Sequence, residues 1–131
     1  MTTNNPARQR ILVIDDNRDS ARTLAMLLKI KGHDVYERYS GADGIAATES
    51  LQPDVVVLDI SMPEMDGYQT CRLIRQQPWG KNLYLIALSG YSYEDDRLRS
   101  GEAGFDAHLV KPVDLEELIR LVSAGRPAGS D

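Results

Sequence analysis

Short apolar runs recur along the chain and alternate with longer, more polar stretches. The runs are rich in Val, Ile and Leu and are too short for helices, a pattern typical of buried strands. Four of them are strongly apolar: Ile11–Ile14, Val55–Leu58, Leu83–Leu88 and Ala107–Val110. A fifth run, Val35–Tyr39, carries Glu37 and Arg38 in its middle, which favours a position at the edge of a sheet. The pattern therefore predicts five strands.

Apolar residues at helical spacing lie between these strands. Positions 21, 24, 25 and 28 are apolar, and so are positions 115, 118, 119 and 122, which matches the i, i+3, i+4, i+7 spacing of an amphipathic helix. The segments 42–51, 66–76 and 93–103 contain no Pro and have Gly or Pro near their ends, so we expect helices there as well.

The alternation of strands and helices predicts a parallel sheet that is covered by helices on both faces and joined by right-handed crossovers. The strand order 2-1-3-4-5 places the polar second strand at an edge and the most apolar strands inside. We therefore expect a doubly wound, five-stranded α/β fold of the flavodoxin-like type.

Size and composition limit the domain organisation and the location. The chain has 131 residues, enough for one domain, which we place at 10–123 between polar tails at 1–9 and 124–131. No apolar run approaches the roughly 18 to 20 residues of a membrane span, and no signal-peptide core precedes the domain, so we expect a cytoplasmic protein. We expect the single cysteine, Cys71, to be a small buried side chain. A net charge of −5 without a basic stripe argues against direct binding of nucleic acid.

Four of the apolar runs are followed by a side chain that can bind a metal or take part in a reaction. Asp15 and Asp16 follow the first strand, and Asp59, Ser89 and Lys111 follow the third, fourth and fifth. Because all parallel strands end at one edge of the sheet, the order 2-1-3-4-5 brings the acidic pair beside Asp59, with Ser89 and then Lys111 further along. Ligands bind at this edge where the strand order reverses, here between the first and third strands.

Three carboxylates in one crevice require a positive charge. Two unit charges 4 Å apart repel by about 4 kcal/mol at an effective dielectric constant of 20. Asp15 or Asp16 alone is more often a helix cap, but the set as a whole favours Lys111 and a hard divalent cation as partners. Oxygen ligands without a His or Cys cluster favour Mg²⁺ over zinc. Asp59 can then act as a nucleophile toward phosphorus, with Lys111 and Ser89 stabilising the phosphoryl oxygens.

Four segments of the sequence resemble the receiver domains of bacterial two-component response regulators. They are 11–16 (ILVIDD), 57–67 (VLDISMPEMDG), 87–90 (ALSG) and 111–112 (KP). Each segment is weak evidence alone, but four in this order at these spacings are specific, and the resemblance covers the chain from about residue 10 to residue 122. The resemblance implies that Asp59 is the phosphoacceptor, that Asp16 and Asp59 bind Mg²⁺ directly, that Asp15 helps through water, and that the backbone carbonyl of Ser61 is a further ligand.

The resemblance also implies a switch. Ser89 matches the hydroxyl residue that moves toward the phosphoryl group, and Lys111 matches the basic residue of the site, with a cis bond to Pro112. The switch aromatic of the family, usually Tyr or Phe three residues before the Lys, is replaced here by His108. We hypothesise that His108 moves with Ser89; a half-buried ring without a pH role is the simpler interpretation of an imidazole there.

The expected partners follow from the resemblance. The phosphoryl donor would be a sensor histidine kinase or a histidine phosphotransfer protein. The sequence around Lys111 is similar to that of receiver domains in hybrid kinases, which suggests a phosphorelay. Because nine residues follow Val122, we expect the signal to leave through a protein contact. The expected contact surface consists of the fourth helix, fifth strand and fifth helix, which carry Arg97, Arg99, His108 and Glu116.

Three alternatives remain open at this stage. A Mg²⁺-dependent phosphohydrolase can pass through an aspartyl-phosphate, but such enzymes carry an acid two positions after the nucleophile, where this chain has Ser61. A receiver-like module that never accepts phosphate is the second alternative. A nucleotide-binding protein is the third, and the first strand lacks the Gly-x-Gly-x-x-Gly turn that it requires. We expect a signalling phosphoacceptor that is not an enzyme.

Overall fold

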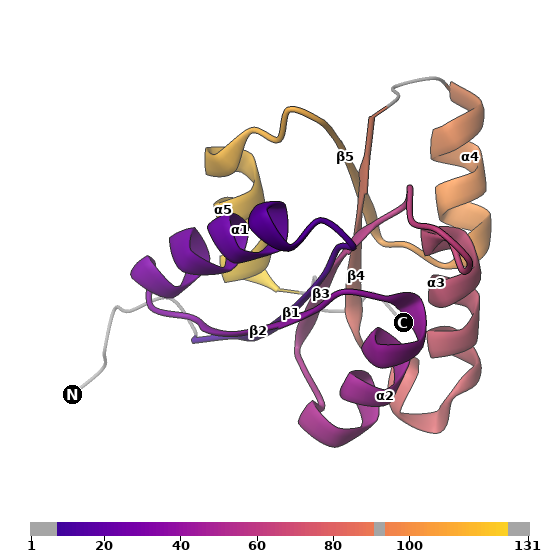
Figure 1. Ribbon diagram of the computed structural model, residues 1–131, viewed down its shortest axis with the longest axis horizontal. Helices are drawn as coiled ribbons and strands as arrows, with labels where there is room; N and C mark the ends of the chain where they lie inside the picture. The colour runs from indigo at the N-terminus through magenta and orange to yellow at the C-terminus, as the bar shows by residue number, and fades with distance from the viewer. Residues whose placement is uncertain (1–7, 91–93, 126–131) are drawn as a thin grey trace.

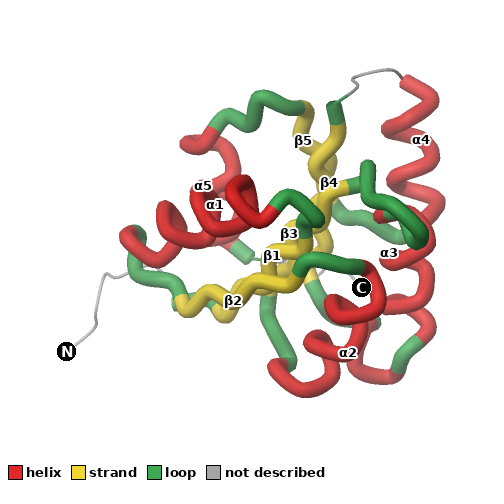
Figure 2. Tube along the Cα trace, in the orientation of Figure 1, coloured by secondary structure: helices red, strands yellow, loops and turns green. Residues whose placement is uncertain are grey.

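The computed structural model describes residues 8–90 and 94–125, with the side chains of 94–97 left out. Strands and helices alternate through the described chain, as Figures 1 and 2 show. The strands are β1 (Arg10–Ile14), β2 (Asp34–Arg38), β3 (Val55–Asp59), β4 (Tyr84–Ser89) and β5 (Ala107–Val110). The helices are α1 (Arg18–Ile30), α2 (Gly41–Leu51), α3 (Gly67–Gln76), the short 3-10 helix η1 (Pro78–Gly80), α4 (Glu94–Ala103) and α5 (Leu115–Ala124).

The five strands form one parallel sheet in the order β2-β1-β3-β4-β5, which confirms the predicted fold and the edge position of the polar strand. The helices α1 and α5 cover one face of the sheet, and α2, α3 and α4 cover the other (Figure 1). The predicted strand and helix boundaries differ from the observed ones by one residue at several ends. The sequence pattern did not predict η1, because its three residues, Pro78 to Gly80, are too few for a periodic signal.

Burial on both faces explains why the central strands are apolar at every position. Ile11 and Val13 of β1 pack toward α1 and α5, whereas Leu12 and Ile14 pack toward α2 and α3. All residues of β3 are buried as well, including Asp59 at its end. A central strand between two helical layers therefore has no solvent-facing side that polar residues could occupy.

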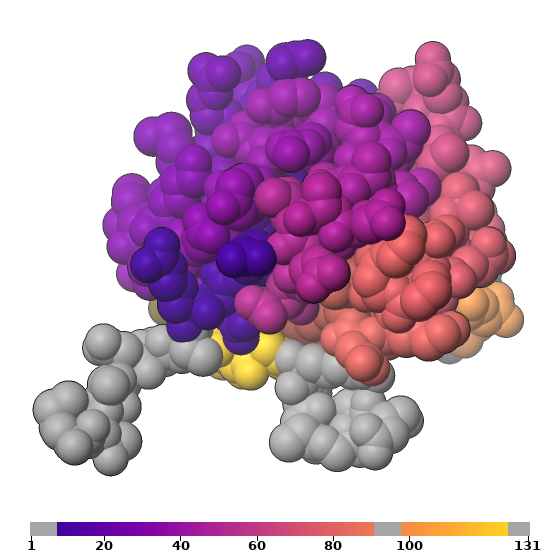
Figure 3. All heavy atoms as spheres, turned by 90° about the horizontal axis from the view of Figure 1, so that it is seen from below, coloured from indigo at the N-terminus to yellow at the C-terminus, as the bar shows by residue number. Residues whose placement is uncertain are grey.

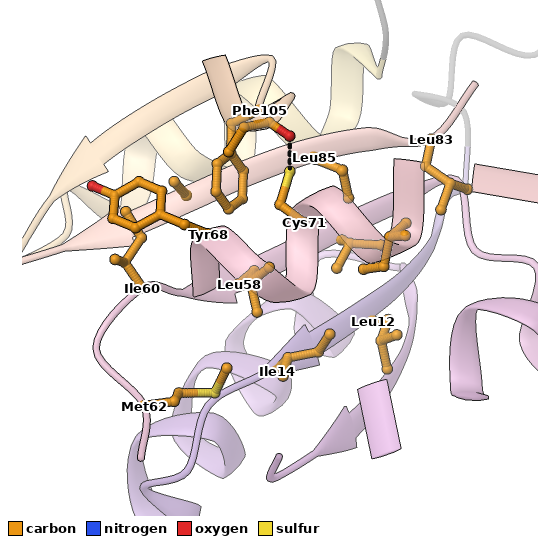
Figure 4. Close-up of a cluster of buried hydrophobic side chains, with 14 of the residues drawn as sticks. Leu12, Ile14, Leu58, Ile60, Met62, Tyr68, Cys71, Leu83, Leu85 and Phe105 are labelled. Carbon is orange, nitrogen blue, oxygen red and sulfur yellow. Dashed lines mark hydrogen bonds between the residues drawn. The ribbon is translucent and has the colours of Figure 1, made fainter. Parts of the chain in front are cut away.

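One of the two core clusters lies between the sheet and α2, α3 and α4 (Figure 4). Cys71 points into this cluster, and its thiol donates a hydrogen bond to the carbonyl of Ala103, 3.4 Å away. Burial raises the pKa of the Cys71 thiol to about 12, with smaller contributions from neighbouring charges. Cys71 is therefore a buried packing residue, as its position in the sequence predicted.

The two ends of the described chain meet at the end of the sheet where the strands begin. Figure 3 shows this face, with the first described residues beside the C-terminal segment. The backbone N–H of Gln9 donates to Nδ1 of His33, and Nε2 of His33 lies 3.2 Å from Oγ of Ser123 in α5. The expected tails, 1–9 and 124–131, lie mostly outside the described residues. Within the part of the chain that is described, none of the helices has the length and apolar character needed to cross a membrane.

Candidate functional site

The turn after β1 fixes the first acidic pair. The backbone N–H of Asp15 donates to the carbonyl of Arg38 at the end of β2, 3.1 Å away, so the sheet pairing extends into the turn. One carboxylate oxygen of Asp15 accepts the backbone N–H of Asn17 at 3.0 Å. Asn17 itself caps α1 by accepting the N–H of Ser20. The helix cap is therefore Asn17, and Asp15 and Asp16 are available for other chemistry.

The end of β3 fixes the third carboxylate. Asp59 is 3% exposed, and its Oδ1 accepts the backbone N–H of Ser61 at 3.1 Å. The N–H of Gly67, the first residue of α3, donates to the carbonyl of Ile60 at 2.9 Å. A Cβ at residue 67 would lie 2.7 Å from the carbonyl oxygen of Asp59 and 2.6 Å from the Cα of Ile60, so only Gly allows this close approach. The start of α3 is thus packed directly against the backbone of Asp59.

The three carboxylates form one cluster. Asp15, Asp16 and Asp59 each offer an oxygen atom, and these atoms lie within 4.8 Å of one another. Asp15 and Asp59 are buried and Asp16 is exposed, so the cluster opens to solvent on one side. Burial is the main reason that the pKa of Asp15 is raised to about 6; the charge of Asp59 and a hydrogen bond to it also raise the pKa, whereas the Asn17 N–H and Lys111 lower it. The charged form of Asp15 is therefore disfavoured in the folded chain, chiefly because the carboxyl group is buried.

Lys111 follows the edge strand β5 and extends its side chain along the same end of the sheet to the cluster. Its Nζ lies 3.3 Å from Oδ2 of Asp59, although β4 lies between β3, which ends at Asp59, and β5, which precedes Lys111. The backbone N–H of Lys111 donates to the carbonyl of Ser89 at 2.7 Å, and the bond to Pro112 is cis, as expected. Three carboxylates beside one ammonium group leave an excess of negative charge, which a divalent cation would neutralise.

The donor set fits the predicted metal. All side chains of the cluster are carboxylates, and hard oxygen donors at this spacing suit Mg²⁺, which binds one or two carboxylates and keeps several waters. The exposed side of Asp16 leaves room for those waters. Ser61 follows the cluster along the chain, with its N–H directed to Asp59. The metal roles of Asp15, Asp16, Asp59 and the carbonyl of Ser61 remain predictions, to which the geometry of the cluster adds support.

Ser89 and His108 lie on the neighbouring strands. Ser89 ends β4, is 3% exposed, and follows Leu88, the residue that pairs with Asp59. His108 pairs with Ala87 in the register of β4 and β5, and both nitrogens of its ring are shielded from solvent. The structure therefore puts the two predicted switch residues on adjacent strands, one of them beside the phosphoacceptor strand.

A groove that the sequence pattern did not predict adjoins the acidic cluster. It has a volume of about 470 Å³ and runs between α1 and the connection from β5 to α5. Its lining includes Asp15 and Lys111 from the site and Leu24, Leu27 and Val113 further away. A pair on the other side of the cluster was also missed: the guanidinium of Arg18 lies over the ring of Tyr39.

Comparison with known proteins decides the family. The model of the response regulator receiver domain matches residues 11–123, nearly the whole chain. This chain belongs to the response regulator receiver domain family. Protein PilG of Pseudomonas aeruginosa is 36% identical over 119 residues, which cover 91% of this chain and 88% of PilG. The transcriptional regulator RpaA of Synechocystis is 31% identical over 115 residues, which cover 88% of this chain but 48% of RpaA. The structure of the chemotaxis protein CheY4 of Vibrio cholerae has the same fold, with a TM-score of 0.85, 22% identity, and coverage of 92% of this chain and 100% of CheY4.

The expected output surface of this receiver domain is partly described. Arg99 in α4 and Glu116 in α5 are exposed, and His108 in β5 is half-buried. The side chain of Arg97 lies outside the described part of the structure. The guanidinium of Arg99 lies over the ring of Tyr68, 4.3 Å from its centroid, which links α4 to the first turn of α3. Signal transduction in two-component systems is the role of the family.

Proposed function

We propose that this receiver domain accepts a phosphoryl group on Asp59 in a Mg²⁺-dependent reaction and signals through a change of its surface. The observation that carries the proposal is the position of the Asp59 carboxylate. It is buried, lies in a cluster with two other carboxylates, and contacts Lys111. An acid with only a structural role at the end of a strand would need neither the two additional carboxylates nor a lysine that reaches it across an intervening strand.

The chemistry assigns different tasks to the two oxygens of Asp59. Oδ1 accepts the N–H of Ser61, which orients the carboxylate, and Oδ2 faces Lys111. One carboxylate oxygen forms a bond to phosphorus while the bond from phosphorus to the donor breaks, and the donor group leaves with that electron pair. Lys111 stabilises the negative charge on the phosphoryl oxygens, and the hydroxyl of Ser89 donates a hydrogen bond to one of them.

Asp16, Asp59 and the carbonyl of Ser61 would hold the Mg²⁺ ion, with Asp15 helping through a bound water. When bound, the ion neutralises charge on the carboxylates and on the transferred phosphoryl group. The convergence of one oxygen atom from each of Asp15, Asp16 and Asp59 within 4.8 Å supports this assignment.

The donor we propose is the phosphohistidine of a sensor histidine kinase or a histidine phosphotransfer protein in the cytoplasm. Ser89 and His108 would change position on phosphorylation and alter the surface of α4, β5 and α5, which binds a downstream protein. RpaA is described as a DNA-binding regulator, but this chain matches 48% of it, and a net charge of −5 favours protein partners over direct contact with nucleic acid.

The test is phosphorylation by a small donor. The purified protein is incubated with acetyl phosphate and Mg²⁺, and its intact mass is measured. We expect the mass of one phosphate to be gained by the wild type and by the control Asp43→Asn, which changes an exposed acid in α2. Asp59→Asn should gain none. Turnover of many phosphomonoester molecules would instead support a phosphohydrolase, and a wild type that gains no phosphate would support a module that only binds partners.

A further inference from the structure

Arg18 lies beside the acidic cluster but does not pair with it. Arg18 follows Asp16 by two positions, so the two Cα atoms are at most about 7.6 Å apart. Its guanidinium carbon lies 4.2 Å from the centroid of the Tyr39 ring. Among the described residues, Arg18 forms no ion pair with any of the three carboxylates of the cluster. A cation next to this much negative charge is therefore held in place by an aromatic ring.

The location of Arg18 in its helix makes the stack more informative. Arg18 is the first residue of α1, where the helix dipole disfavours a positive charge. The stack on Tyr39 offsets this cost through the attraction between the cation and the ring. Stacking uses the flat face of the guanidinium, whereas its five N–H donors point outward in the plane of the group. Arg18 can therefore stay on Tyr39 and bind an anion at the same time.

Tyr39 is itself fixed at the opposite side of the site from Lys111. It follows β2, and its hydroxyl donates to the carboxylate of Glu37 at 3.0 Å. The acids lie at the ends of β1 and β3, in the order β2-β1-β3-β4-β5. Tyr39, which carries Arg18 on its ring, follows β2 on one side of them, and Lys111 follows β5 on the other side. Figure 2 shows the turn after β1 next to the end of β2, consistent with the hydrogen bond from Asp15 to Arg38.

The groove beside α1 is consistent with this arrangement. On the Lys111 side the groove is lined by Asp19 and Ser20 of the first helical turn, and Arg18 does not line it. Consecutive residues of a helix point about 100° apart, so Arg18 and Asp19 face different sides of the site. The opening of the acidic cluster thus has a cation at each side, and Lys111 already contacts Asp59.

We propose that Arg18 is a donor-binding residue, which contacts the leaving-group side of an anionic phosphoryl donor, and that Tyr39 positions it. This inference rests on the proposed function of Asp59. With acetyl phosphate, a carboxylate oxygen of Asp59 forms the new bond to phosphorus, the bond between phosphorus and the acetyl oxygen breaks, and acetate leaves with that electron pair without proton transfer. Since the attacking and leaving oxygens are roughly in line, acetate departs toward the opening, where Arg18 compensates its charge.

Tyr39 has a second task in this arrangement. A guanidinium forms strong bidentate pairs with carboxylates, and an Arg18 released from the ring would reach for the same oxygens that a divalent cation needs. The stack keeps the charge of Arg18 near the opening and away from Asp15 and Asp16. The metal site and the donor site are thereby separated, although both lie within a few residues of the first strand end.

The first test compares two donors with different leaving groups. Acetyl phosphate releases acetate, an anion, whereas phosphoramidate releases neutral ammonia. With Mg²⁺ present, we expect Arg18→Ala to slow labelling by acetyl phosphate about threefold to tenfold, with a much smaller effect on phosphoramidate. Arg18→Lys should retain most of the rate, and the control Arg22→Ala, at an exposed position of α1, should behave as the wild type. Equal rates for Arg18→Ala and wild type with acetyl phosphate would overturn the inference, and so would equal slowing with both donors.

The second test needs no phosphoryl transfer. The Mg²⁺ dissociation constant is measured by calorimetry for the wild type, Tyr39→Leu, and the double variant with Arg18→Ala. We expect Tyr39→Leu to weaken Mg²⁺ binding and the double variant to restore it; an unchanged constant in Tyr39→Leu contradicts the positioning role. A wild type that no donor labels would refute the proposed function and this inference together, whereas normal labelling of Arg18→Ala would refute this inference alone.

Discussion

The ammonium group of Lys111 lies 3.3 Å from the carboxylate of Asp59, although β4 lies between the strand that ends at Asp59 and the strand that precedes Lys111. The long side chain of Lys111 spans the strand between, and the hydrogen bond from its backbone N–H to the carbonyl of Ser89 fixes where that side chain begins. Asp59 is buried and Lys111 is partly exposed, so the contact joins the interior of the site to its opening. A cation in this position can stabilise the negative charge of the free carboxylate and, after transfer, the negative charge of the attached phosphoryl group.

Replacement of Lys111 should therefore slow the reaction more than it changes the fold. We expect Lys111→Ala to reduce the rate of phosphorylation by acetyl phosphate about 100-fold to 1000-fold, the range for loss of one group that stabilises developing charge. The partial exposure of Lys111 means that stability should change little. Stopped reactions followed by intact mass give the rate, and Lys29→Ala in α1 is the matched control. A rate within twofold, on the order of experimental error in such assays, would remove Lys111 from the reaction.

The raised pKa of Asp15 predicts how stability depends on pH. The pKa of Asp15 is 3.8 in the unfolded chain and about 6 in the folded chain. At pH values below both, Asp15 is protonated in both states. Between them the folded chain holds more protons, so the stability that protonation of Asp15 provides is lost as the pH rises through this range. The difference corresponds to at most about 3 kcal/mol. Without metal, Asp15→Asn should thus be more stable than the wild type at pH 7, and the gain should vanish toward pH 4.

Urea unfolding in the presence of a chelator measures this gain. The single tryptophan, Trp79, is a suitable probe, because its indole N–H donates to Thr48 at 3.0 Å, in the part of the protein away from the site. Saturating Mg²⁺ should stabilise the wild type at pH 7 and do so far less for Asp15→Asn. Equal stability of the two proteins at pH 7 in chelator would show that folding does not raise the pKa of Asp15.

His33 predicts a pH dependence of the opposite sign. Burial lowers the pKa of His33, and its Nδ1 accepts the N–H of Gln9, which requires the neutral ring. Below the ordinary value of 6.5 the unfolded chain takes up a proton before the folded chain does, so the stability from a neutral His33 is lost as the pH falls. His33→Gln should therefore show a flatter loss of stability below pH 6.5 than the wild type. Parallel curves for the two proteins would contradict the buried, neutral ring; Ser123→Ala, which keeps the histidine, is the control.

Gly67 offers a test of the close contact between α3 and Asp59. A Cβ at this residue meets the backbone of Asp59 and Ile60, which cannot shift as a side chain can, so Gly67→Ala should destabilise the protein by more than about 2 kcal/mol and impair phosphorylation. The control Gly101→Ala lies in α4 with no atom within 4 Å of the new Cβ and should stabilise by about 0.5–1 kcal/mol. Thermal unfolding of both variants gives the comparison; a Gly67→Ala protein as stable as the wild type would show that the backbone there yields easily.

The fold, and the meeting of the three acids at one edge of the sheet, could be predicted from the sequence for physical reasons that differ between elements. Val55–Leu58 could be recognised because a strand covered on both faces must be apolar throughout, and Asp59 stood out because it ended that run. Topology alone placed Lys111 two strands away from Asp59, and only the side-chain conformation shows that the gap is bridged. The Arg18 and Tyr39 stack could not be predicted, because two residues in separate turns share no periodic signal.

A covalent bond between Asp59 and phosphorus can be detected by reductive mapping. The wild type is treated with acetyl phosphate and Mg²⁺ and then with borohydride, which reduces an acyl phosphate to the alcohol, and the digested peptides are analysed by tandem mass spectrometry. We expect Asp59 to be converted to homoserine, Asp15 and Asp16 to be unchanged, and the conversion to be abolished when Mg²⁺ is omitted. Conversion at Asp15 or Asp16 with Asp59 unmodified would contradict the proposed function.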